Sequence, residues 1–355
     1  SLSQVTAVPT PSSDNTSSYT FSSNEAGDTI FGGSCSSSDN TTSSGSNTIT
    51  FNALPDGTYD NCTIRVTDNA SNISSPLSVS SFTIGSQTPA LAQVTAVPTP
   101  DNDTTPEYTF FSTLSGTINY SGDCSSSDNS ADADNNTITF NALSEGLHWN
   151  CKISVTSSSS NLTSDNLSVD NFTIDITAPS LSQVTAVPTP ANDSTPSYTF
   201  NSNEAGTITY GGSCSSSDTS AIAGNNTVTF NTLSEGTYND CKISVTDSAS
   251  NTSDNLSVST FTIDRTAPSL SQVTAVPTPS SDNTSSYTFS SNEAGTITYG
   301  GSCSSSDNSS INGNNTITFN ALSDDTYSDC TITVTDNASN ASNALSVNTF
   351  VIDTT

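Results

Sequence analysis

One segment recurs four times along this chain, and the length of its period limits what the chain can fold into. The sequence Gln-Val-Thr-Ala-Val-Pro-Thr-Pro begins at Gln4, Gln93, Gln183 and Gln272, so the spacing is 89, then 90, then 89 residues. This period is too long for a solenoid unit of about 20 to 50 residues and is close to the ~100 residues of one small β-sandwich. We therefore divide the 355 residues into four tandem domains, repeats 1 to 4, which cover residues 1–85, 86–175, 176–264 and 265–355.

Each repeat has the pattern of several short β-strands. In repeat 3 the strand patterns cover residues 183–187, 197–202, 207–211, 227–231, 236–246 and 255–264, with a further short strand between 215 and 224. Turns rich in Pro, Gly, Asn and Asp separate these runs. Six or seven antiparallel strands are what an immunoglobulin-like Greek-key sandwich requires. The predicted fold is therefore all-β, with four tandem immunoglobulin-like β-sandwich domains in an elongated rod.

The last strand of each repeat changes phase midway. In repeat 3, Leu256 and Val258 alternate in one phase, whereas Phe261 and Ile263 alternate in the other. A β-bulge adds one residue to a strand and so returns both halves to the same face. The sequence therefore predicts a bulge between Val258 and Phe261.

The eight cysteines recur in pairs that are always 27 residues apart. One pair per repeat, at the same place each time, predicts an intradomain disulfide and hence an oxidising compartment. In the expected strand order the first cysteine follows strand C and the second lies inside strand F, the neighbour of strand C in the same sheet. The predicted bridges are Cys35–Cys62, Cys124–Cys151, Cys214–Cys241 and Cys303–Cys330.

The charge balance excludes several classes of partner. The chain carries 34 acidic and only 4 basic residues, a formal net charge of -30. So few cations cannot neutralise a run of phosphates, so we expect no binding to nucleic acid and no docking on an anionic membrane. No apolar run approaches the roughly 18 residues that span a bilayer, so we expect no direct membrane insertion by this segment.

The sequence offers no catalytic constellation. It has no recurring histidine, no glycine-rich phosphate loop and no nucleophile at a familiar distance from a base, so we expect no enzyme activity and name no catalytic residue. The single histidine, His148, stands where the other repeats have Tyr59, Tyr238 and Tyr327, just before strand F. Because this position resembles a tyrosine corner, we interpret His148 as a structural substitute.

Four motifs together resemble one protein family. They are Val-Pro-Thr-Pro-x-x-Asp, Glu-Ala-Gly-Thr-Ile-Thr-Tyr-Gly-Gly-Ser-Cys at 293–303, Val-Thr-Asp-x-Ala-Ser-Asn at 245–251 and Ile-Asp-x-Thr-Ala-Pro at 263–268. They are similar to the bacterial immunoglobulin-like repeats of very large, secreted surface proteins of Gram-negative bacteria, and the similarity extends over the whole chain. Such repeats serve as stalks, adhesive modules or filament material, and the resemblance implies that calcium can rigidify the joints between domains.

The residues at the joints can be compared with that expectation. In an immunoglobulin-like topology strand G delivers the linker to the end of the next domain that carries its B–C and F–G loops. The joint from repeat 2 to repeat 3 then combines Asp175, Glu204 and Asp247, and the joint from repeat 3 to repeat 4 combines Asp264, Glu293 and Asp336. The joint from repeat 1 to repeat 2 has Gly85, Leu114 and Ser157 at the same three positions. Because the three carboxylates are lost together, we interpret the two intact groups as possible calcium sites.

Further aspartates recur in every repeat and have two possible interpretations. Those of the A–B loops and of the Cys-Ser-Ser-Ser-Asp turns could add oxygen ligands from the preceding domain. They could instead stabilise their own turns, because an aspartate side chain accepts hydrogen bonds from the local backbone. We favour the second interpretation for these residues, which are Asp14, Asp103, Asp193 and Asp282 in the loops and Asp39, Asp128, Asp218 and Asp307 in the turns.

The expected function is mechanical. We expect a structural segment of a long extracellular bacterial surface protein, in which each domain adds about 35 to 40 Å of length. Its expected partners are further copies of the same repeat in a longer chain and, in a filament, identical chains. The alternative is an adhesive module whose loops recognise a glycan or a host protein; repeat 2, with Leu114, His148, Trp149 and Leu162, then differs most from the others. Exposure of Trp149 is a condition of that alternative.

Overall fold

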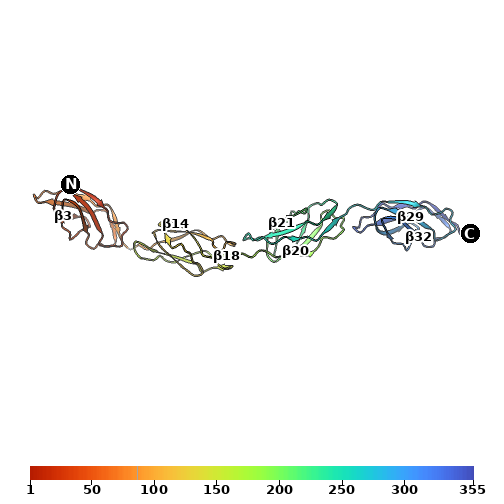
Figure 1. The fold of residues 1–355 in the computed structure, drawn as a ribbon, viewed down its shortest axis with the longest axis horizontal. Helices are drawn as coiled ribbons and strands as arrows, with labels where there is room; N and C mark the ends of the chain where they lie inside the picture. The colour runs from red at the N-terminus through yellow and green to blue at the C-terminus, as the bar shows by residue number, and fades with distance from the viewer. Residues whose placement is uncertain (86) are drawn as a thin grey trace. The chain divides into compact units, whose positions relative to one another are not determined.

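The computed structural model describes residues 1–85 and 87–355, and every regular element in that part of the chain is a β-strand (Figure 1). The chain forms two compact units, Ser1–Ile176 and Thr177–Thr355. Among the described residues no helix is long and apolar enough to cross a membrane. The predicted start of repeat 2, residue 86, lies outside the described residues, and the four repeat boundaries stay predictions.

Within the described residues every repeat contains nine strands, several of them very short. Repeat 1 has β1 (Leu2–Thr6), β2 (Ser18–Ser23), β3 (Gly27–Gly32), β4 (Thr41–Thr42), β5 (Gly45–Thr50), β6 (Gly57–Tyr59), β7 (Thr63–Asp68), β8 (Leu77–Ser78) and β9 (Phe82–Ile84). Repeat 2 has β10 (Leu91–Thr95), β11 (Glu107–Ser112), β12 (Gly116–Ser121), β13 (Ser130–Ala131), β14 (Asn135–Thr139), β15 (Gly146–His148), β16 (Lys152–Ser157), β17 (Leu167–Ser168) and β18 (Phe172–Ile174).

The strands of the second unit follow the same order. Repeat 3 has β19 (Leu181–Thr185), β20 (Ser197–Ser202), β21 (Gly206–Gly211), β22 (Ser220–Ala221), β23 (Gly224–Thr229), β24 (Gly236–Tyr238), β25 (Lys242–Thr246), β26 (Leu256–Ser257) and β27 (Phe261–Ile263). Repeat 4 has β28 (Leu270–Thr274), β29 (Ser286–Ser291), β30 (Gly295–Gly300), β31 (Ser309–Ser310), β32 (Gly313–Thr318), β33 (Asp325–Tyr327), β34 (Thr331–Thr335), β35 (Leu345–Ser346) and β36 (Phe350–Ile352).

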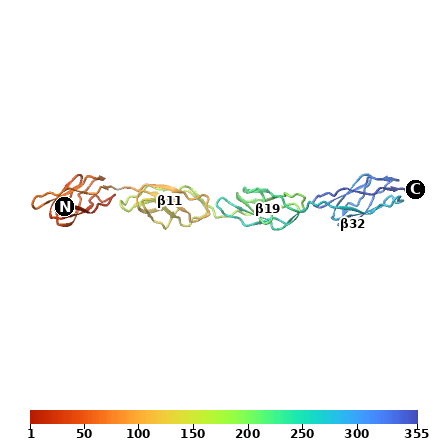
Figure 2. The same cartoon turned by 90° about the horizontal axis from the view of Figure 1, so that it is seen from above.

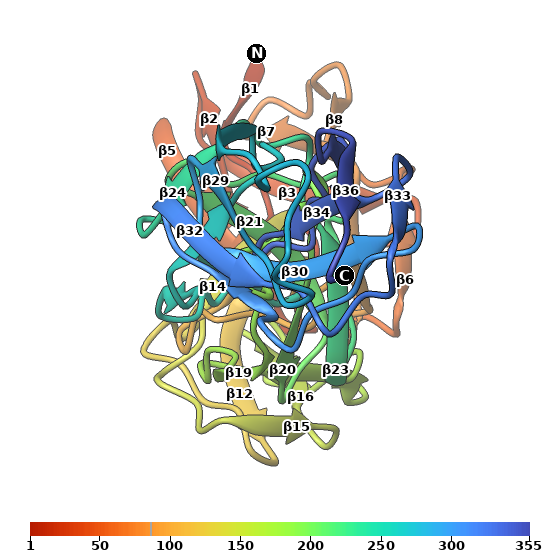
Figure 3. The ribbon, with the colours of Figure 1, turned by 90° about the vertical axis from the view of Figure 1, so that its right-hand side faces the viewer.

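The described strands of each repeat form a three-stranded, a four-stranded and a two-stranded antiparallel sheet. In repeat 3 the two-stranded sheet is β24-β27, and the two larger sheets have the orders β19-β20-β23 and β22-β21-β25-β26. In immunoglobulin nomenclature these are sheets A-B-E and C′-C-F-G, so the predicted Greek-key sandwich is confirmed. Figure 2 shows one cluster of segments for each repeat, and Figure 3 labels β32 and β30, which belong to the two larger sheets of repeat 4.

Alternation along the strands builds a separate core in each repeat. In β20 the side chains of Tyr198 and Phe200 are fully buried, whereas the residue between them is half-buried. Tyr198 stacks on Phe230, with ring centroids 6.1 Å apart, and Phe230 stacks on Phe261 at 6.2 Å. Each fully buried side chain of this size contributes about 1.5 to 3 kcal/mol. A small core of stacked aromatic rings can therefore support a domain whose outer faces are polar.

The predicted bulge in the last strand was wrong, because the strand is interrupted there instead. β26 pairs with β25 and β27 pairs with β24, and Val258, Phe261 and Ile263 are all buried. The side chain of Gln183 fills the break, because its Oε1 accepts a hydrogen bond from the backbone N–H of Ser259 at 3.1 Å. This glutamine opens the recurring motif, which therefore connects the first strand of the repeat to the interrupted last strand.

The four predicted disulfides are all present. Each joins cysteines whose Cα atoms lie 5.2 or 5.3 Å apart, and the pairs are Cys35–Cys62, Cys124–Cys151, Cys214–Cys241 and Cys303–Cys330. One detail of the prediction was wrong, because residues 236–246 are not one strand. Cys241 lies in the interruption between β24 and β25.

A glycine permits the close approach that each disulfide requires. Gly212, two residues before Cys214, has a φ of 75°, in the left-handed region that favours glycine. A Cβ atom at this position would lie 2.1 Å from the carbonyl oxygen of Asp240, next to Cys241. Gly33, Gly122 and Gly301 occupy the same place in the other repeats.

The residue before strand F forms the expected corner. The hydroxyl group of Tyr238 donates a hydrogen bond to the carbonyl oxygen of Ser234 at 2.9 Å. In repeat 2 the Nε2 atom of His148 lies 2.9 Å from the carbonyl oxygen of Ser144, and the ring stacks on Phe172. His148 is thus a structural substitute for tyrosine, as predicted. The neighbouring Trp149 points outward and is 65% exposed, which meets the condition for the adhesive alternative.

Candidate functional site

Three carboxylates meet inside the second unit. Asp264 follows β27, Glu293 lies in the turn between β29 and β30, and Asp336 follows β34. One oxygen atom from each of these side chains can be chosen so that all three lie within 4.8 Å of one another. The three residues are far apart in the sequence, and the predicted grouping from a linker and two loops is confirmed.

Local hydrogen bonds hold Asp336 in position. Its Oδ1 accepts a hydrogen bond from the backbone N–H of Asn340 at 2.8 Å, and its Oδ2 accepts one from the Nδ2 group of the same asparagine at 3.0 Å. Asp336 is therefore only 9% exposed although it lies at the tip of a turn. These two hydrogen bonds fix the conformation of the turn without a ligand.

The same asparagine ties this turn to the linker. The Nδ2 group of Asn340 also donates to the backbone carbonyl oxygen of Asp264 at 2.9 Å. On its other side Asp264 is anchored in repeat 3, where its N–H donates to the carbonyl oxygen of Ala191 at 2.9 Å. The linker carboxylate therefore has a defined position between the two repeats that it connects.

The electrostatics of the group oppose full ionisation. Burial raises the pKa of Glu293, and the negative charges of Asp264, Asp336 and Glu235 raise it further. A nearby positive charge would reverse this effect, because an opposite charge favours the ionised carboxylate. The donor atoms are all carboxylate oxygens, which are the ligands that hard cations such as Ca²⁺ take.

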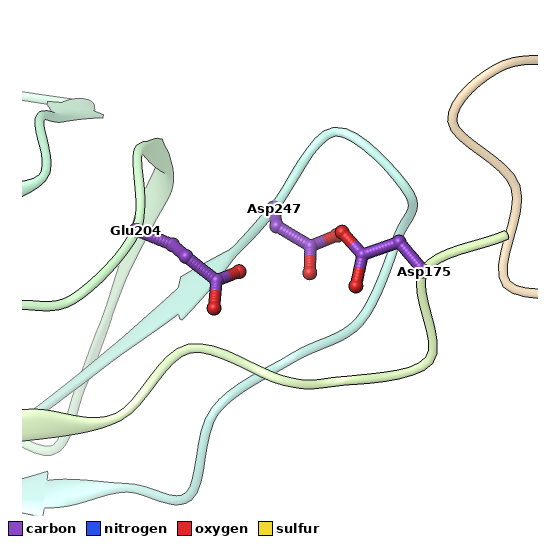
Figure 4. A group of neighbouring side chains, drawn as sticks. All are labelled: Asp175, Glu204 and Asp247. Carbon is purple, nitrogen blue, oxygen red and sulfur yellow. The ribbon is translucent and has the colours of Figure 1, made fainter. Parts of the chain in front are cut away.

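The equivalent residues are Asp175 at the end of repeat 2 and Glu204 and Asp247 of repeat 3, which are drawn in Figure 4. Asp175 belongs to the first compact unit, whereas Glu204 and Asp247 belong to the second. Asp247 is held in the same way as Asp336: its Oδ1 accepts from the N–H of Asn251 at 2.9 Å and its Oδ2 from the Nδ2 group of Asn251 at 3.0 Å. The aspartate and the asparagine four residues later therefore form the same turn in repeats 3 and 4.

At the joint from repeat 1 to repeat 2, hydroxyl groups take the place of the carboxylates. The Oγ atom of Ser157 accepts hydrogen bonds from the backbone N–H groups of Ser159 and Ser160, at 3.2 and 3.3 Å. The Oγ–H group of Ser160 donates to the carbonyl oxygen of Gln87 in the linker at 2.7 Å. Direct hydrogen bonds thus connect loop and linker where Gly85, Leu114 and Ser157 replace the acidic group.

Repeat 1 also carries a pair of carboxylates at this end, although no joint before it is part of the sequence comparison. Glu25 and Asp68 of repeat 1 correspond to Glu204 and Asp247, and both line one hollow of about 130 Å³. The side chain of Asn72 donates to Asp68 and, as the largest cause, lowers the pKa of this carboxyl group. The signal was present in the sequence, since Asp68 and Asn72 have the same spacing as Asp247 and Asn251.

The recurring aspartates of the A–B loops stabilise their own turns, as we expected, but for the aspartates of the Cys-Ser-Ser-Ser-Asp turns that expectation was wrong, because their side chains bond to a strand further along the chain. In repeat 3 the Oδ1 atom of Asp193 accepts from the N–H of Thr195 at 2.8 Å. The Oδ2 atom of Asp218 accepts from the N–H of Thr229 at 3.0 Å, at the outer edge of β23. The same edge bond recurs at Asp39, Asp128 and Asp307.

The chain is only distantly similar to known proteins. No protein-family model matches the chain, and no curated protein matches it. Among solved structures, Escherichia coli alpha-2-macroglobulin activated by porcine elastase matches with 8% identity and a TM-score of 0.21 over 99% of this chain and 44% of that one. A Salmonella alpha-2-macroglobulin mutant matches with 11% identity and a TM-score of 0.16 over 96% and 30%. The chain thus spans less than half the length of either protein, and at these TM-scores the fold assignment rests on the strand topology.

Proposed function

We propose that this chain is a structural segment of a long extracellular bacterial surface protein, acting as stalk or filament material, with calcium at the joints before repeats 3 and 4. It is not an enzyme in this proposal. The observation that carries the proposal is a contrast between two joints. At the joint before repeat 4, carboxylates meet at Asp264, whereas at the joint before repeat 2 a hydroxyl group bonds directly to the carbonyl oxygen of Gln87. Residues that vary together at a joint, while cores and turns stay constant, suggest selection on the connection between domains.

The disulfides support the proposed location. Four intradomain bridges indicate an oxidising environment, which extracellular and periplasmic proteins share. Each bridge closes a loop of 27 residues and stabilises its repeat by about 3 kcal/mol in the chain-entropy model. Small polar domains that are stabilised in this way can function outside the cell without a large core.

The donor set of the joint fits calcium. Asp264, Glu293 and Asp336 bring three carboxylate oxygens together, one from each side chain, and Ca²⁺ takes 6 to 8 oxygen ligands, so water would supply the others. When bound, the ion would neutralise the repulsion that raises the pKa of Glu293. Asp264 would then connect repeat 3 to the two loops of repeat 4, and the joint would be held. Without the cation, the hydrogen bond from Asn340 to the Asp264 carbonyl is what holds this linker to the F–G turn.

Small-angle scattering of the whole chain tests the proposal. With Ca²⁺ we expect a larger and more uniform maximum dimension than with a chelator, because two of the three joints are held. The variant Glu293→Gln with Asp336→Asn should lose the part of this response that belongs to the joint before repeat 4.

A turn aspartate supplies the matched control. The variant Asp282→Asn removes one negative charge at a residue that caps its own turn, where Oδ1 accepts from the N–H of Thr284 at 2.9 Å. It should keep the full calcium response. Identical scattering with Ca²⁺ and with chelator would refute calcium at the joints, and a compact, collapsed chain in both would refute the stalk.

A further inference from the structure

Repeat 2 exposes two large apolar side chains that the other repeats lack. Trp149, the only tryptophan of the chain, is 65% exposed, and Leu147 is 59% exposed. His148 between them points into the core, so Leu147 and Trp149 point to the outer side, as successive side chains of an extended segment do. The corresponding residues elsewhere are polar: Thr58 and Asp60, Thr237 and Asn239, and Thr326 and Ser328.

Folding does not require these two residues. In repeat 3, Thr237 lies opposite Thr262, and the two hydroxyl groups form a hydrogen bond of 3.1 Å on the exposed face. In repeat 2, Leu147 lies opposite Thr173 and gives up that bond. The repeat thus replaces a satisfied polar pair with exposed apolar surface, which indicates a role outside the fold.

Polar groups border this surface in fixed positions. A shallow hollow of about 390 Å³ lies beside Leu147 and is also lined by Asp123, Ser144 and Glu145. Asn150, next to Trp149, accepts a hydrogen bond from the N–H of Asp123 at 2.9 Å and donates one to its carboxylate at 3.1 Å. The volume lies within the range of small-ligand sites.

Size and charge limit what can bind here. The two side chains expose on the order of 250 Å² together, whereas a stable protein interface buries about 800 Å² on each partner. An anionic ligand is disfavoured by Asp123 and Glu145 and by the net charge of -30. A small neutral ligand with one apolar face and several hydroxyl groups fits both the aromatic surface and its mixed donors and acceptors.

We propose that repeat 2 carries a carbohydrate-binding site, in which the indole ring of Trp149 stacks on the apolar face of a neutral sugar. Leu147 extends the apolar surface, and Asp123 and Asn150 exchange hydrogen bonds with the sugar hydroxyls. This proposal does not depend on the calcium joints. A stalk with one such module would both project and attach.

Because Trp149 is the only tryptophan, its fluorescence reports on this site alone. We would titrate the whole chain with four neutral oligosaccharides at millimolar concentration, namely maltohexaose, cellohexaose, chitohexaose and mannohexaose. Hexa-arginine is the alternative probe, because a cationic peptide is attracted to the same aromatic ring and to the neighbouring carboxylates. At least one sugar should shift the emission to shorter wavelength and protect the indole from acrylamide quenching. A shift with hexa-arginine alone would overturn the sugar assignment, and no protection by any probe would overturn the site.

Variants with the residues of repeat 3 separate binding from folding. Leu147→Thr and Trp149→Asn introduce residues that the same fold already carries at Thr237 and Asn239. Trp149→Asn should weaken binding to the immobilised sugar by about tenfold, the scale of one aromatic contact, and Leu147→Thr should weaken it by a smaller factor. The control Ile222→Ser removes another exposed apolar side chain, in repeat 3, and should bind as the parent does. Equal loss in all three variants would mean non-specific apolar adsorption and would overturn the proposal.

Discussion

Replacing Gly212 by alanine tests how strictly the turn before Cys214 is constrained. Gly212 combines a φ of 75° with a position where a Cβ atom would lie 2.1 Å from the carbonyl oxygen of Asp240. A left-handed conformation costs a non-glycine residue about 1 to 2 kcal/mol. Relieving the overlap requires the backbone to move, which costs about 1 to 3 kcal/mol more of the free energy of unfolding.

The expected loss of about 2 to 5 kcal/mol is large for a domain of this size. A repeat of about 89 residues has a free energy of unfolding of about 4 to 13 kcal/mol. With a urea m value of about 1 kcal/mol/M, the midpoint of repeat 3 should fall by about 2 M or more. We would measure it by hydrogen-exchange mass spectrometry in increasing urea, because repeat-specific peptides distinguish repeat 3 from the others.

Two other glycines of repeat 3 separate the two contributions. Gly224 has a φ of 116°, and a Cβ atom at this position would have no other atom within 4 Å, so Gly224→Ala should show only the conformational cost. Gly211 has an ordinary φ, and its nearest neighbour would be the Cβ of Lys242 at 3.7 Å, so Gly211→Ala should be nearly neutral. Equal midpoints for all three variants would refute the close approach of Gly212 to Asp240.

Three further predictions concern single features. His148→Tyr should stabilise repeat 2 by about 1 kcal/mol in thermal unfolding, because the Nδ1 atom of His148 is buried without a hydrogen bond among the described residues; a loss of stability would contradict this account. The double variant Cys214→Ala with Cys241→Ala should destabilise repeat 3 by about 3 kcal/mol in urea, and an unchanged midpoint would show that the bridge does not restrict the unfolded chain. Because the pKa of Glu293 is raised in the folded chain, its protonated form contributes stability that is present below the ordinary pKa of glutamate and is lost as the pH rises through the raised value. In chelator, the parent chain should therefore gain stability relative to the Glu293→Gln variant as the pH falls from the raised pKa to the ordinary pKa of glutamate, and a constant difference between the two over that range would contradict this account.

Much of the fold follows from pattern alone, because alternation, turn residues and the cysteine period all indicate the same sandwich. β20 occupies the predicted residues 197–202, where a tyrosine and a phenylalanine alternate with polar residues. The interruption of strand F was missed, since residues 236–246 alternate on both sides of Cys241 and nothing in the pattern shows the break. The predicted strand at 183–187 is Leu181–Thr185, where the register shifts between Gln183 and Thr185.

The candidate site was only partly predictable. Topology placed the linker and two loops together, because loops at one end of a sandwich share that end whatever their sequence. The closeness of Asp264 to Asp336 depends also on Asn340, which bonds to both, and a side chain with two partners in different segments leaves no periodic signal. The outward direction of Trp149 follows from the inward direction of His148, which the corner position predicts only once its hydrogen bond to Ser144 is known.

The aspartate at the edge of β23 has a consequence for how such a chain reaches its native state. Adjacent domains that are nearly identical can exchange strands while they fold, and an open sheet edge is where pairing with the wrong copy begins. Asp218 occupies the N–H of Thr229 at that edge and places a negative charge beside it, and the same arrangement recurs in every repeat. Each domain thus occupies one N–H group of this edge from within its own sequence, which disfavours pairing of that edge with a neighbouring copy.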